Sequence, residues 1–485
     1  MDIMSVIKVI SGLLWGTPLI VLILFSGVLF TLGSKFFQVA YIRHILKNTI
    51  GTLFKKADSH GSGMMRPFEV ISIAVGGAVG VGNIGGVATA IAVGGPGSAF
   101  WIWVAAVLGM MMKMAEVSLA VYYRSVDEKG GYYGGPTYYM QKGLGRDKGF
   151  KLWWLLAFVF GFGIFGNVFS MQNFTVSQSL NATFGVPMLA VSAVYVALTY
   201  WATVREIPWL GKLAAKVVPP MCIFYLLGGL AIILLNADKL PATLALIVSD
   251  AFTGTAATGA FAGAGVSVVI QSGLARAMFS SEAGWGTSPM IHASAKTEHP
   301  VKQGLWGAFE VFVGTVCICT VTSLVVIITG EWTTGLTGAP LTLKAFETVL
   351  GSLGTIIITI AIFLFALSTT TGWWAYFEVL LRHLCGENVK LKQRLINAFK
   401  VIYPIPGFLV VLLAVVGKDV SGNDIWEIAN LTTGIPAFVN LIVIVVLSGK
   451  FFQLLKDYKA RYLGVGKVDP NFKIFDEDEN KDKRQ

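Results

Sequence analysis

Glycine fills six of the eleven positions in Gly76–Gly86, which read GGAVGVGNIGG inside an apolar segment long enough to cross a bilayer. Glycine costs about 1 kcal/mol per interior helix position relative to alanine, and main chain opened in lipid must find new hydrogen-bond partners. A helix break here is tolerated only where it faces a protein cavity. There, half-helix N-termini attract anions and C-terminal carbonyls attract cations. A second candidate break is Thr253–Gly265, which reads TGTAATGAFAGAG.

Charged side chains are missing from the middle of both predicted breaks. Glu69 lies near the start of the first, while Arg276 and Glu282 lie beyond the end of the second. A cavity lined by main chain and neutral groups suits a small zwitterion, whose two charges meet the two kinds of helix end. The crowding of glycine and alanine favours a small neutral amino acid.

Asn83 is the one strongly polar side chain in the first break. It either coordinates a cation or a substrate carboxylate, or caps the second half-helix, and these roles are compatible. Gly80 and Gly82 leave room for a ligand to approach the main chain; the alternative is close helix packing by small residues.

The second break and the fourth apolar segment add further candidates for substrate contact. The hydroxyls of Thr255 and Thr258 either bind ligand or cap half-helices, and Phe261 either walls the pocket or packs in the core. Gln172, within GNVFSMQN, either faces the pocket or binds a neighbouring helix.

Four successive hydroxyls, Ser368–Thr371, lie in an otherwise apolar segment. Such side chains can bond back to their own helix, but two on one face would supply the oxygen ligands that a hard cation prefers. We predict a Na⁺ site formed by Ser368, Thr369 and Thr371 with main chain at Gly77. Trp373 is a candidate substrate wall; the alternative is an anchor at the membrane interface.

Lys113, Glu116 and Glu310 are the ionisable residues deepest in the apolar segments. Lys113 and Glu116 are three residues apart on one helix face, so we expect them to pair. Glu310 is the one plausible proton-coupling carboxylate. Because the predicted pocket holds no titratable group, Na⁺ is favoured over H⁺ as the coupling ion.

Composition identifies the elements that must position these residues. The chain is 55% apolar and 13% charged, whereas soluble domains carry about 25% charged residues, so we predict an all-α integral membrane protein. A span needs about 20 apolar residues. Eleven segments are candidates: roughly 13–38, 68–92, 98–123, 152–180, 187–204, 213–236, 241–275 (interrupted), 303–330, 340–376, 397–417 and 426–449.

Lysine and arginine residues are concentrated in the loops on one side of the membrane. With the N-terminus outside, the outer loops hold four of them and the inner loops 31, as the positive-inside rule requires. We expect a multi-pass protein of the cell (plasma) membrane with a cytoplasmic C-terminus, residues 1–467 forming the membrane domain and 468–485 a polar tail. The net charge of +10 is explained by this topology and by contact with anionic lipid. We therefore expect no nucleic-acid partner.

After one extra helix, the remaining ten segments divide into units of about 68–236 and 241–449. Each unit opens with a predicted broken helix, and the two begin on opposite sides of the membrane. This arrangement is typical of the inverted repeats of secondary transporters.

Several long motifs carry a family resemblance. They are GNIGGVATAIAVGGPGSAFWIWVAAVLGM (Gly82–Met110), GGPTYYMQKGLG (Gly134–Gly145), GLARAMFSSEAGWGTSPMIHASAKTEHPVKQGLW (Gly273–Trp306), FEVF (Phe309–Phe312) and ALSTTTGWWAYFE (Ala366–Glu378). The chain resembles the alanine or glycine:cation symporter family (sodium:alanine symporters), a branch of the amino acid–polyamine–organocation superfamily.

The resemblance implies a leucine-transporter-like fold with one helix ahead of a 5+5 repeat, and import of alanine or glycine with Na⁺. It places ligand contacts at Gly80, Gly82, Asn83, Thr369 and Trp373. The chain departs from the family pattern where polar residues are usual: Ala78 and Val81 are apolar, and Gly314 replaces a frequent aspartate.

Other functions fit less well. A carrier of another small zwitterion driven by H⁺ is the nearest alternative, and a channel, which needs a continuous polar pore, is the next. The spans offer neither paired carboxylates nor a histidine cluster for an enzyme. We expect no cofactor beyond the coupling ion, and no disulfide or bound metal among the four cysteines.

Overall fold

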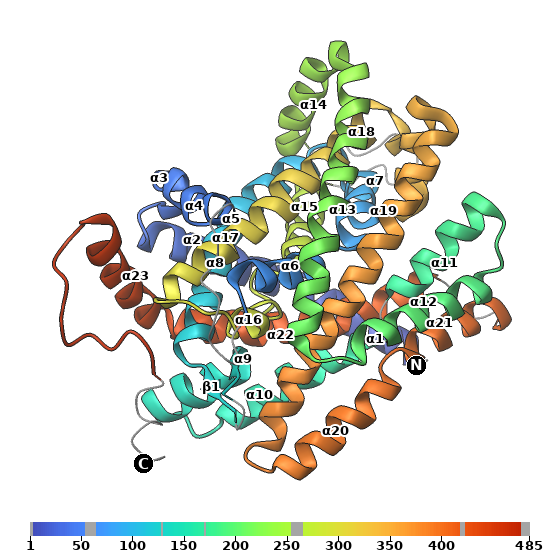
Figure 1. Ribbon diagram of the computed structural model, residues 1–485. Helices are drawn as coiled ribbons and strands as arrows, with labels where there is room; N and C mark the ends of the chain where they lie inside the picture. Colours follow the sequence, from blue (N-terminus) through green and yellow to red (C-terminus); the bar gives the residue numbers. More distant parts are fainter. Residues whose placement is uncertain are drawn as a thin grey trace.

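The computed structural model describes residues 3–53, 65–127, 130–168, 171–253, 265–417 and 422–476. Helices make up nearly all of this part of the chain (Figure 1). Its one sheet is a short antiparallel hairpin of β1 (Ser125–Val126) and β2 (Tyr132–Tyr133). The predicted all-α architecture is confirmed.

The helices of the described residues fall into three groups along the sequence. The first group is α1 (Ile3–Leu14), α2 (Thr17–Gly33), α3 (Phe37–Ala40), α4 (Ile42–Asn48), α5 (Ile50–Leu53), α6 (Pro67–Ala78), the π-helical turn η1 (Gly82–Gly86), α7 (Val87–Gly94) and α8 (Ser98–Tyr122). The second is α9 (Pro136–Tyr139), η2 (Met140–Asp147), α10 (Trp153–Gly166), α11 (Met171–Phe184), α12 (Met188–Thr203), α13 (Ile207–Leu235), η3 (Ala237–Lys239), α14 (Leu240–Thr253) and α15 (Val266–Ser281). The third is α16 (Pro289–His292), α17 (Pro300–Val311), η4 (Phe312–Cys319), α18 (Thr320–Ile328), η5 (Glu331–Thr333), α19 (Gly338–Cys385), α20 (Val389–Ile402), α21 (Ile405–Val416), α22 (Gly422–Val446) and α23 (Ser448–Leu463).

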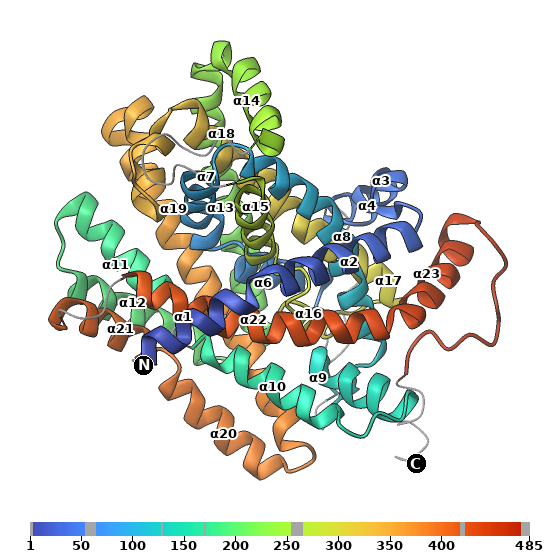
Figure 2. The same cartoon turned by 180° about the vertical axis from the view of Figure 1, so that it is seen from behind.

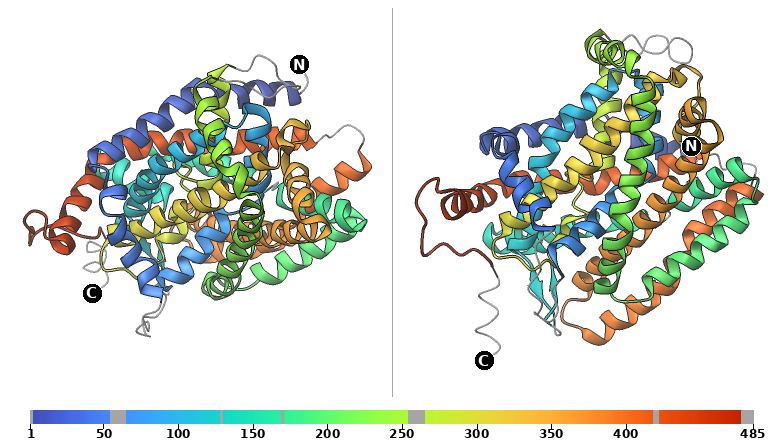
Figure 3. Two further views of the ribbon diagram at one scale, coloured as in Figure 1. Left: turned by 90° about the horizontal axis from the view of Figure 1, so that it is seen from above. Right: turned by 45° about the horizontal axis from the view of Figure 1, so that its top comes forward.

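Several of these helices can cross a membrane. Within the described residues, seven are long and apolar enough, or up to nine when each sharply bent pair counts as one span. Helices α1, α2 and α22 pack together along the face shown in Figure 2 and along one edge in Figure 3. The count of eleven spans and the orientation of the termini stay predictions.

The first predicted break is confirmed between α6 and η1. Helix α6 begins with Pro67 at its first turn, and the Glu69 side chain accepts a hydrogen bond from the Arg66 N–H (3.2 Å), a favourable start for a helix. It ends at Ala78, and Val79 is extended (φ −83°, ψ 92°). The axis then turns by 51° into the segment Gly82–Gly94.

A second interruption lies between α15 and α16, at a different place from the predicted break at 253–265. Most of the predicted break, residues 254–264, lies outside the described residues. Helix α15 instead stops at a run of left-handed backbone: Glu282 (φ 51°), Gly284 (φ 85°) and Gly286 (φ 85°). Such conformations end a helix, and Pro289 starts the short α16.

Helices α6 and α19 approach closely beside the first break. A Cβ on Gly372 would lie 3.0 Å from the Gly77 Cα and 3.1 Å from the Ile73 carbonyl oxygen. Small residues at membrane helix contacts allow main chains to meet in this way. The contact fixes α19 against the end of α6, where the site is built.

We expect Gly372→Ala to destabilise the protein by about 1–3 kcal/mol, because the added methyl group overpacks the α6–α19 contact. A thermal melt of purified protein in detergent would show a lower midpoint. Gly161→Ala is the matched control, since a Cβ at Gly161 in α10 would meet nothing within 4 Å. Equal midpoints for the two variants would contradict the close contact.

Candidate ligand pocket between the broken helices

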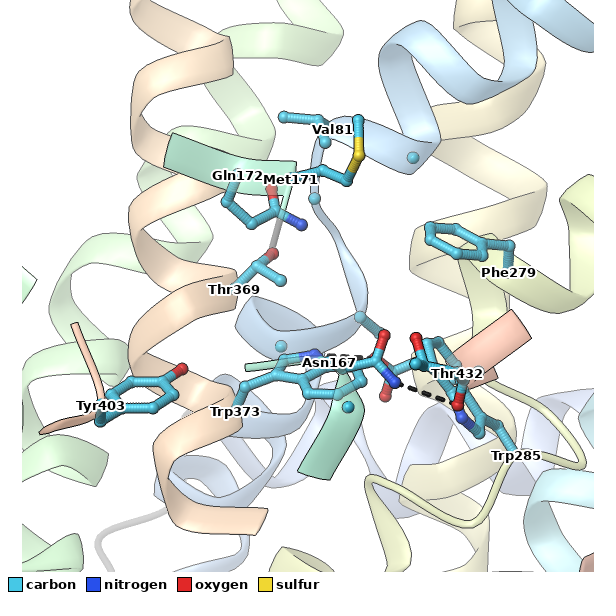
Figure 4. A pocket seen from close by; sticks show the side chains of 16 residues that line it. Val81, Asn167, Met171, Gln172, Phe279, Trp285, Thr369, Trp373, Tyr403 and Thr432 are labelled. Carbon is cyan, nitrogen blue, oxygen red and sulfur yellow. Dashed lines mark hydrogen bonds between the residues drawn. The ribbon is translucent and has the colours of Figure 1, made fainter. Parts of the chain in front are cut away.

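A cavity of about 50 Å³ lies where both broken helices are interrupted. In Figure 4, Gln172 lies above Thr369, Trp373 and Trp285 lie below, and Phe279 is at the side. The lining residues come from α6 and the break, α10, α11, α15 and its break, α19, the α20–α21 connection and α22: Gly77, Ala78, Gly80, Val81, Gly82, Gly166, Asn167, Met171, Gln172, Phe279, Glu282, Trp285, Thr369, Trp373, Tyr403 and Thr432.

The structure brings several predicted residues together on this wall. Four are predicted substrate residues: Gly80, Gly82, Gln172 and Trp373. Two are predicted ion ligands: Gly77 and Thr369. Three further substrate candidates, Thr255, Thr258 and Phe261, lie outside the described residues.

Asn83 supports the break from behind the wall. Its Oδ1 accepts a hydrogen bond from the Gly80 N–H (3.1 Å), and its Nδ2 donates to the carbonyls of Ser280 (3.3 Å) and Gly314 (3.1 Å). The side chain is fully buried and does not line the cavity. The contacts of Asn83 are structural, although they differ from the predicted cap of the second half-helix: they tie the first break to the end of α15 and to η4.

Five oxygen atoms converge beside the pocket. The Ser368 Oγ donates to the carbonyls of Gly76 (3.1 Å) and Phe365 (2.9 Å). The Thr369 Oγ1 donates to the carbonyls of Gly76 (3.1 Å) and Val79 (3.3 Å). The α6 carbonyls face these hydroxyls because the helix ends there without further intrahelical donors. We call these five atoms the oxygen cluster.

Two predicted ion ligands do not belong to the oxygen cluster. The Thr371 Oγ1 bonds back to its own helix, at the carbonyls of Leu367 (2.9 Å) and Ser368 (3.1 Å), and lines a separate apolar cavity. Gly77 lies on the pocket wall, but the hydroxyls meet the carbonyls of its neighbour Gly76 and of Val79. The 100° turn per residue of a helix decides which neighbour faces inward.

Trp373 belongs to an aromatic wall inside the protein. Its ring packs edge-to-face against Trp285 (5.1 Å between centroids), which in turn packs against Phe279 (5.6 Å). Its Nε1 donates to the Glu282 Oε1 (3.2 Å). Because the Trp373 side chain is buried, the role of an interfacial anchor is excluded.

Glu282 is the site residue that sequence reasoning missed. Its carboxylate is buried on the pocket wall and also accepts from the Thr287 Oγ1 (2.5 Å). The expectation that the pocket holds no titratable group is wrong, because Glu282 lines it where α15 ends. The signal was present: Gly284, Gly286 and Pro289 follow closely after it.

The expected pair of Lys113 with Glu116 is also wrong. The Lys113 Nζ donates to the Glu282 carbonyl (2.7 Å) and to the Ser288 Oγ (3.0 Å), and lies 3.8 Å from the Glu310 Oε1. Lys113 thus holds the second break and faces Glu310 on α17.

Glu116 instead braces α22 against the second break. Its two oxygens accept from the Gly284 N–H (3.0 Å) and the Asn440 Nδ2 (2.5 Å). The Glu310 Oε2 accepts from the Ser288 Oγ (2.9 Å) and contacts the His292 Nε2 (3.2 Å). All of these groups are buried, so the residues around the second break form one polar network inside the protein.

Helices interrupted beside a small polar pocket are typical of secondary transporters with a leucine-transporter-like fold. The crystal structure of MhsT in complex with L-phenylalanine shares this fold, with a TM-score of 0.54, 14% identity, and coverage of 80% of this chain and 90% of that one. This likeness defines the class by fold, that of the leucine-transporter-like membrane proteins.

The chain belongs to the sodium:alanine symporter family, whose sequence model matches residues 1–473. It is 35% identical to the sodium/alanine symporter AgcS of Methanococcus maripaludis, over 93% of this chain and 96% of the relative. It is also 35% identical to the probable sodium/glutamine symporter GlnT of Bacillus subtilis, over 96% and 92% respectively. The resemblance seen in the motifs is confirmed.

We expect Lys113→Met to destabilise the fold by about 3–5 kcal/mol, because it leaves buried carboxylates without their cation. Thermal melts and the yield of monodisperse protein would measure the loss. The double variant Lys113→Met/Glu310→Gln should recover part of it. Lys344→Met is the control, since Lys344 pairs with Glu347 at the surface (3.2 Å), where pairs contribute little. Lys113→Met melting like wild type would contradict this role.

Proposed function

We propose that the protein imports alanine or glycine together with Na⁺ by alternating access. The observation that carries the proposal is the oxygen cluster beside the pocket. Na⁺ is a hard cation, and hard cations bind carbonyl and hydroxyl oxygens. A hydroxyl can turn a lone pair toward a cation as readily as it donates its hydrogen, so Ser368 and Thr369 can serve as ligands with three carbonyls.

The pocket favours a small zwitterion. Its volume is about 50 Å³, and three of its lining residues at the first break are glycines: Gly77, Gly80 and Gly82. The substrate carboxylate would lie toward the N-terminal end of η1–α7, and the ammonium group toward the C-terminal ends of α6 and α15, following the helix dipoles. The aromatic wall of Phe279, Trp285 and Trp373 would enclose the short side chain.

Thr369 connects the ion to the substrate. It lines the pocket, and its hydroxyl belongs to the oxygen cluster. A cation bound there would fix Thr369 and the bend of the main chain after Gly76. The pocket shape would then depend on the ion, which is the differential affinity that coupling requires.

The names of two relatives support Na⁺ as the coupling ion but differ in the substrate. One relative is named for sodium and alanine and another for sodium and glutamine. The small pocket favours alanine or glycine over the longer side chain of glutamine. A carrier driven by H⁺ is the second candidate, because Glu282 gives the pocket the titratable group that the sequence analysis did not find.

Purified protein in liposomes should take up radiolabelled alanine when an inward Na⁺ gradient is imposed. Replacing Na⁺ by choline should remove most of the uptake, and unlabelled glycine should compete better than glutamine. Empty liposomes are the control. Equal uptake on a pH gradient without Na⁺ would contradict the assigned ion.

Thr369→Val should raise the Na⁺ concentration for half-maximal uptake at least tenfold, equivalent to about 1.4 kcal/mol, because it removes one oxygen ligand. Thr371→Val is the matched control on the same helix, since the Thr371 hydroxyl serves only its own helix. Uptake titrated with Na⁺ would compare the two. The same Na⁺ dependence in both variants would place the ion elsewhere.

A further inference from the structure

We propose that Glu282 binds a proton and the substrate ammonium group in competition, so that each amino acid bound releases a proton from the pocket. The inference rests on the proposed function in one respect, the zwitterionic substrate. It adds a proton site and a substrate contact.

The second break directs the Glu282 carboxylate into the pocket. The residue ends α15 in a left-handed conformation (φ 51°, ψ 18°). Its two oxygens accept from the Trp373 Nε1 (3.2 Å) and the Thr287 Oγ1 (2.5 Å). Among the acidic side chains in the described part of the chain, Glu282 alone lines this pocket. It is the carboxylate of the buried network that a substrate can reach.

The network around Glu282 is short of positive charge. Three carboxylates face one lysine and one histidine, so full ionisation leaves the network with a net negative charge even when the histidine carries a proton. An uncompensated buried charge costs several kcal/mol, which favours a proton on one carboxyl group. The titratable groups surrounding Glu282 are Lys113 and Glu116 on α8, His292 on α16, Glu310 on α17 and the Tyr376 hydroxyl on α19.

Hydrogen-bond chemistry selects Glu282 as the proton carrier. Both oxygens of Glu116 accept from N–H donors, which cannot accept in return, so protonation there would lose a bond. Glu310 lies 3.8 Å from the Lys113 ammonium. The Thr287 hydroxyl beside Glu282 can accept as well as donate. Glu282 can therefore take a proton without losing a partner.

A second feature of the pocket indicates a polar ligand. Trp285 lines the same cavity, and its buried Nε1 has no hydrogen-bond partner among the described residues. Buried donors are nearly always paired, so this N–H calls for an acceptor from a polar ligand. The pocket thus offers such a ligand a donor as well as the Glu282 carboxylate.

The exchange balances in atoms and charge. The protonated Glu282 carboxyl loses its proton to the bulk solvent, and the carboxylate pairs with the incoming ammonium group. One positive charge replaces another, so the network keeps its net charge. Binding should then weaken up to tenfold for each pH unit below the titration midpoint of Glu282.

The test uses the purified full-length protein in detergent with saturating Na⁺. Alanine is added in weakly buffered solution containing a pH-sensitive dye, and its affinity is measured in parallel between about pH 5 and pH 9. We expect release approaching one proton per alanine bound in the acidic part of this range, and weaker binding at low pH. Alanine binding without proton release at any pH would overturn the inference and leave the proposed function intact. Absence of alanine binding would overturn both.

Two variants assign the proton to Glu282. Glu282→Gln should abolish the release, and undiminished release would overturn the assignment. Should Glu282→Gln fail to fold, Thr287→Val provides the test. Thr287 does not line the pocket, and its hydroxyl stabilises the Glu282 carboxylate. We expect it to move the midpoint of proton release to higher pH, and an unchanged midpoint would overturn the assignment. Glu331→Gln, on the short η5 helix away from the network, controls for a general effect of losing one acid.

Discussion

The need to partner the carbonyls freed at the end of α6 controls the architecture of the site. Main-chain oxygens released inside a membrane protein must find donors or a cation. Here the carbonyls of Gly76 and Val79 meet two hydroxyls of α19. The close contact of Gly372 with Gly77 sets that distance, and Asn83 holds the other side of the bend. The packing of α6 against α19, the break and the proposed ion ligands thus depend on the same contacts.

The second break is stabilised by charged side chains together with the hydroxyls of Thr287 and Ser288. Lys113 holds the Glu282 carbonyl, and Glu116 accepts the Gly284 N–H. Ionic groups inside membrane proteins are expensive and mark functional places. These two residues lie one helical turn apart on α8 yet serve separate partners, which explains why the expected pair between them does not form. The same network places one carboxylate, that of Glu282, against the ligand pocket.

The sequence predicted the first half of the site better than the second. Glycine content located the first break, and hydroxyl content located the right part of α19, because both depend on composition within one helix. The choice of Thr369 over Thr371 depends on how α19 is rotated against α6, which no single segment encodes. Glu282 was missed because its helix was expected to break earlier, near the glycines of 253–265. Three backbone positions of positive φ after Ser281 decide that break, and their conformation depends on partners from α8.

The hydroxyls of the oxygen cluster have a consequence for the transport cycle as a whole. In the empty site the hydroxyl hydrogens bond to the carbonyls at the end of α6. In a loaded site the hydroxyl lone pairs and these carbonyls would bind the same cation. The main-chain carbonyls at the bend therefore have partners with or without a bound cation. In the proposed alternating-access cycle, the empty site could therefore reorient across the membrane at modest energetic cost, and this step is required for net accumulation of a solute.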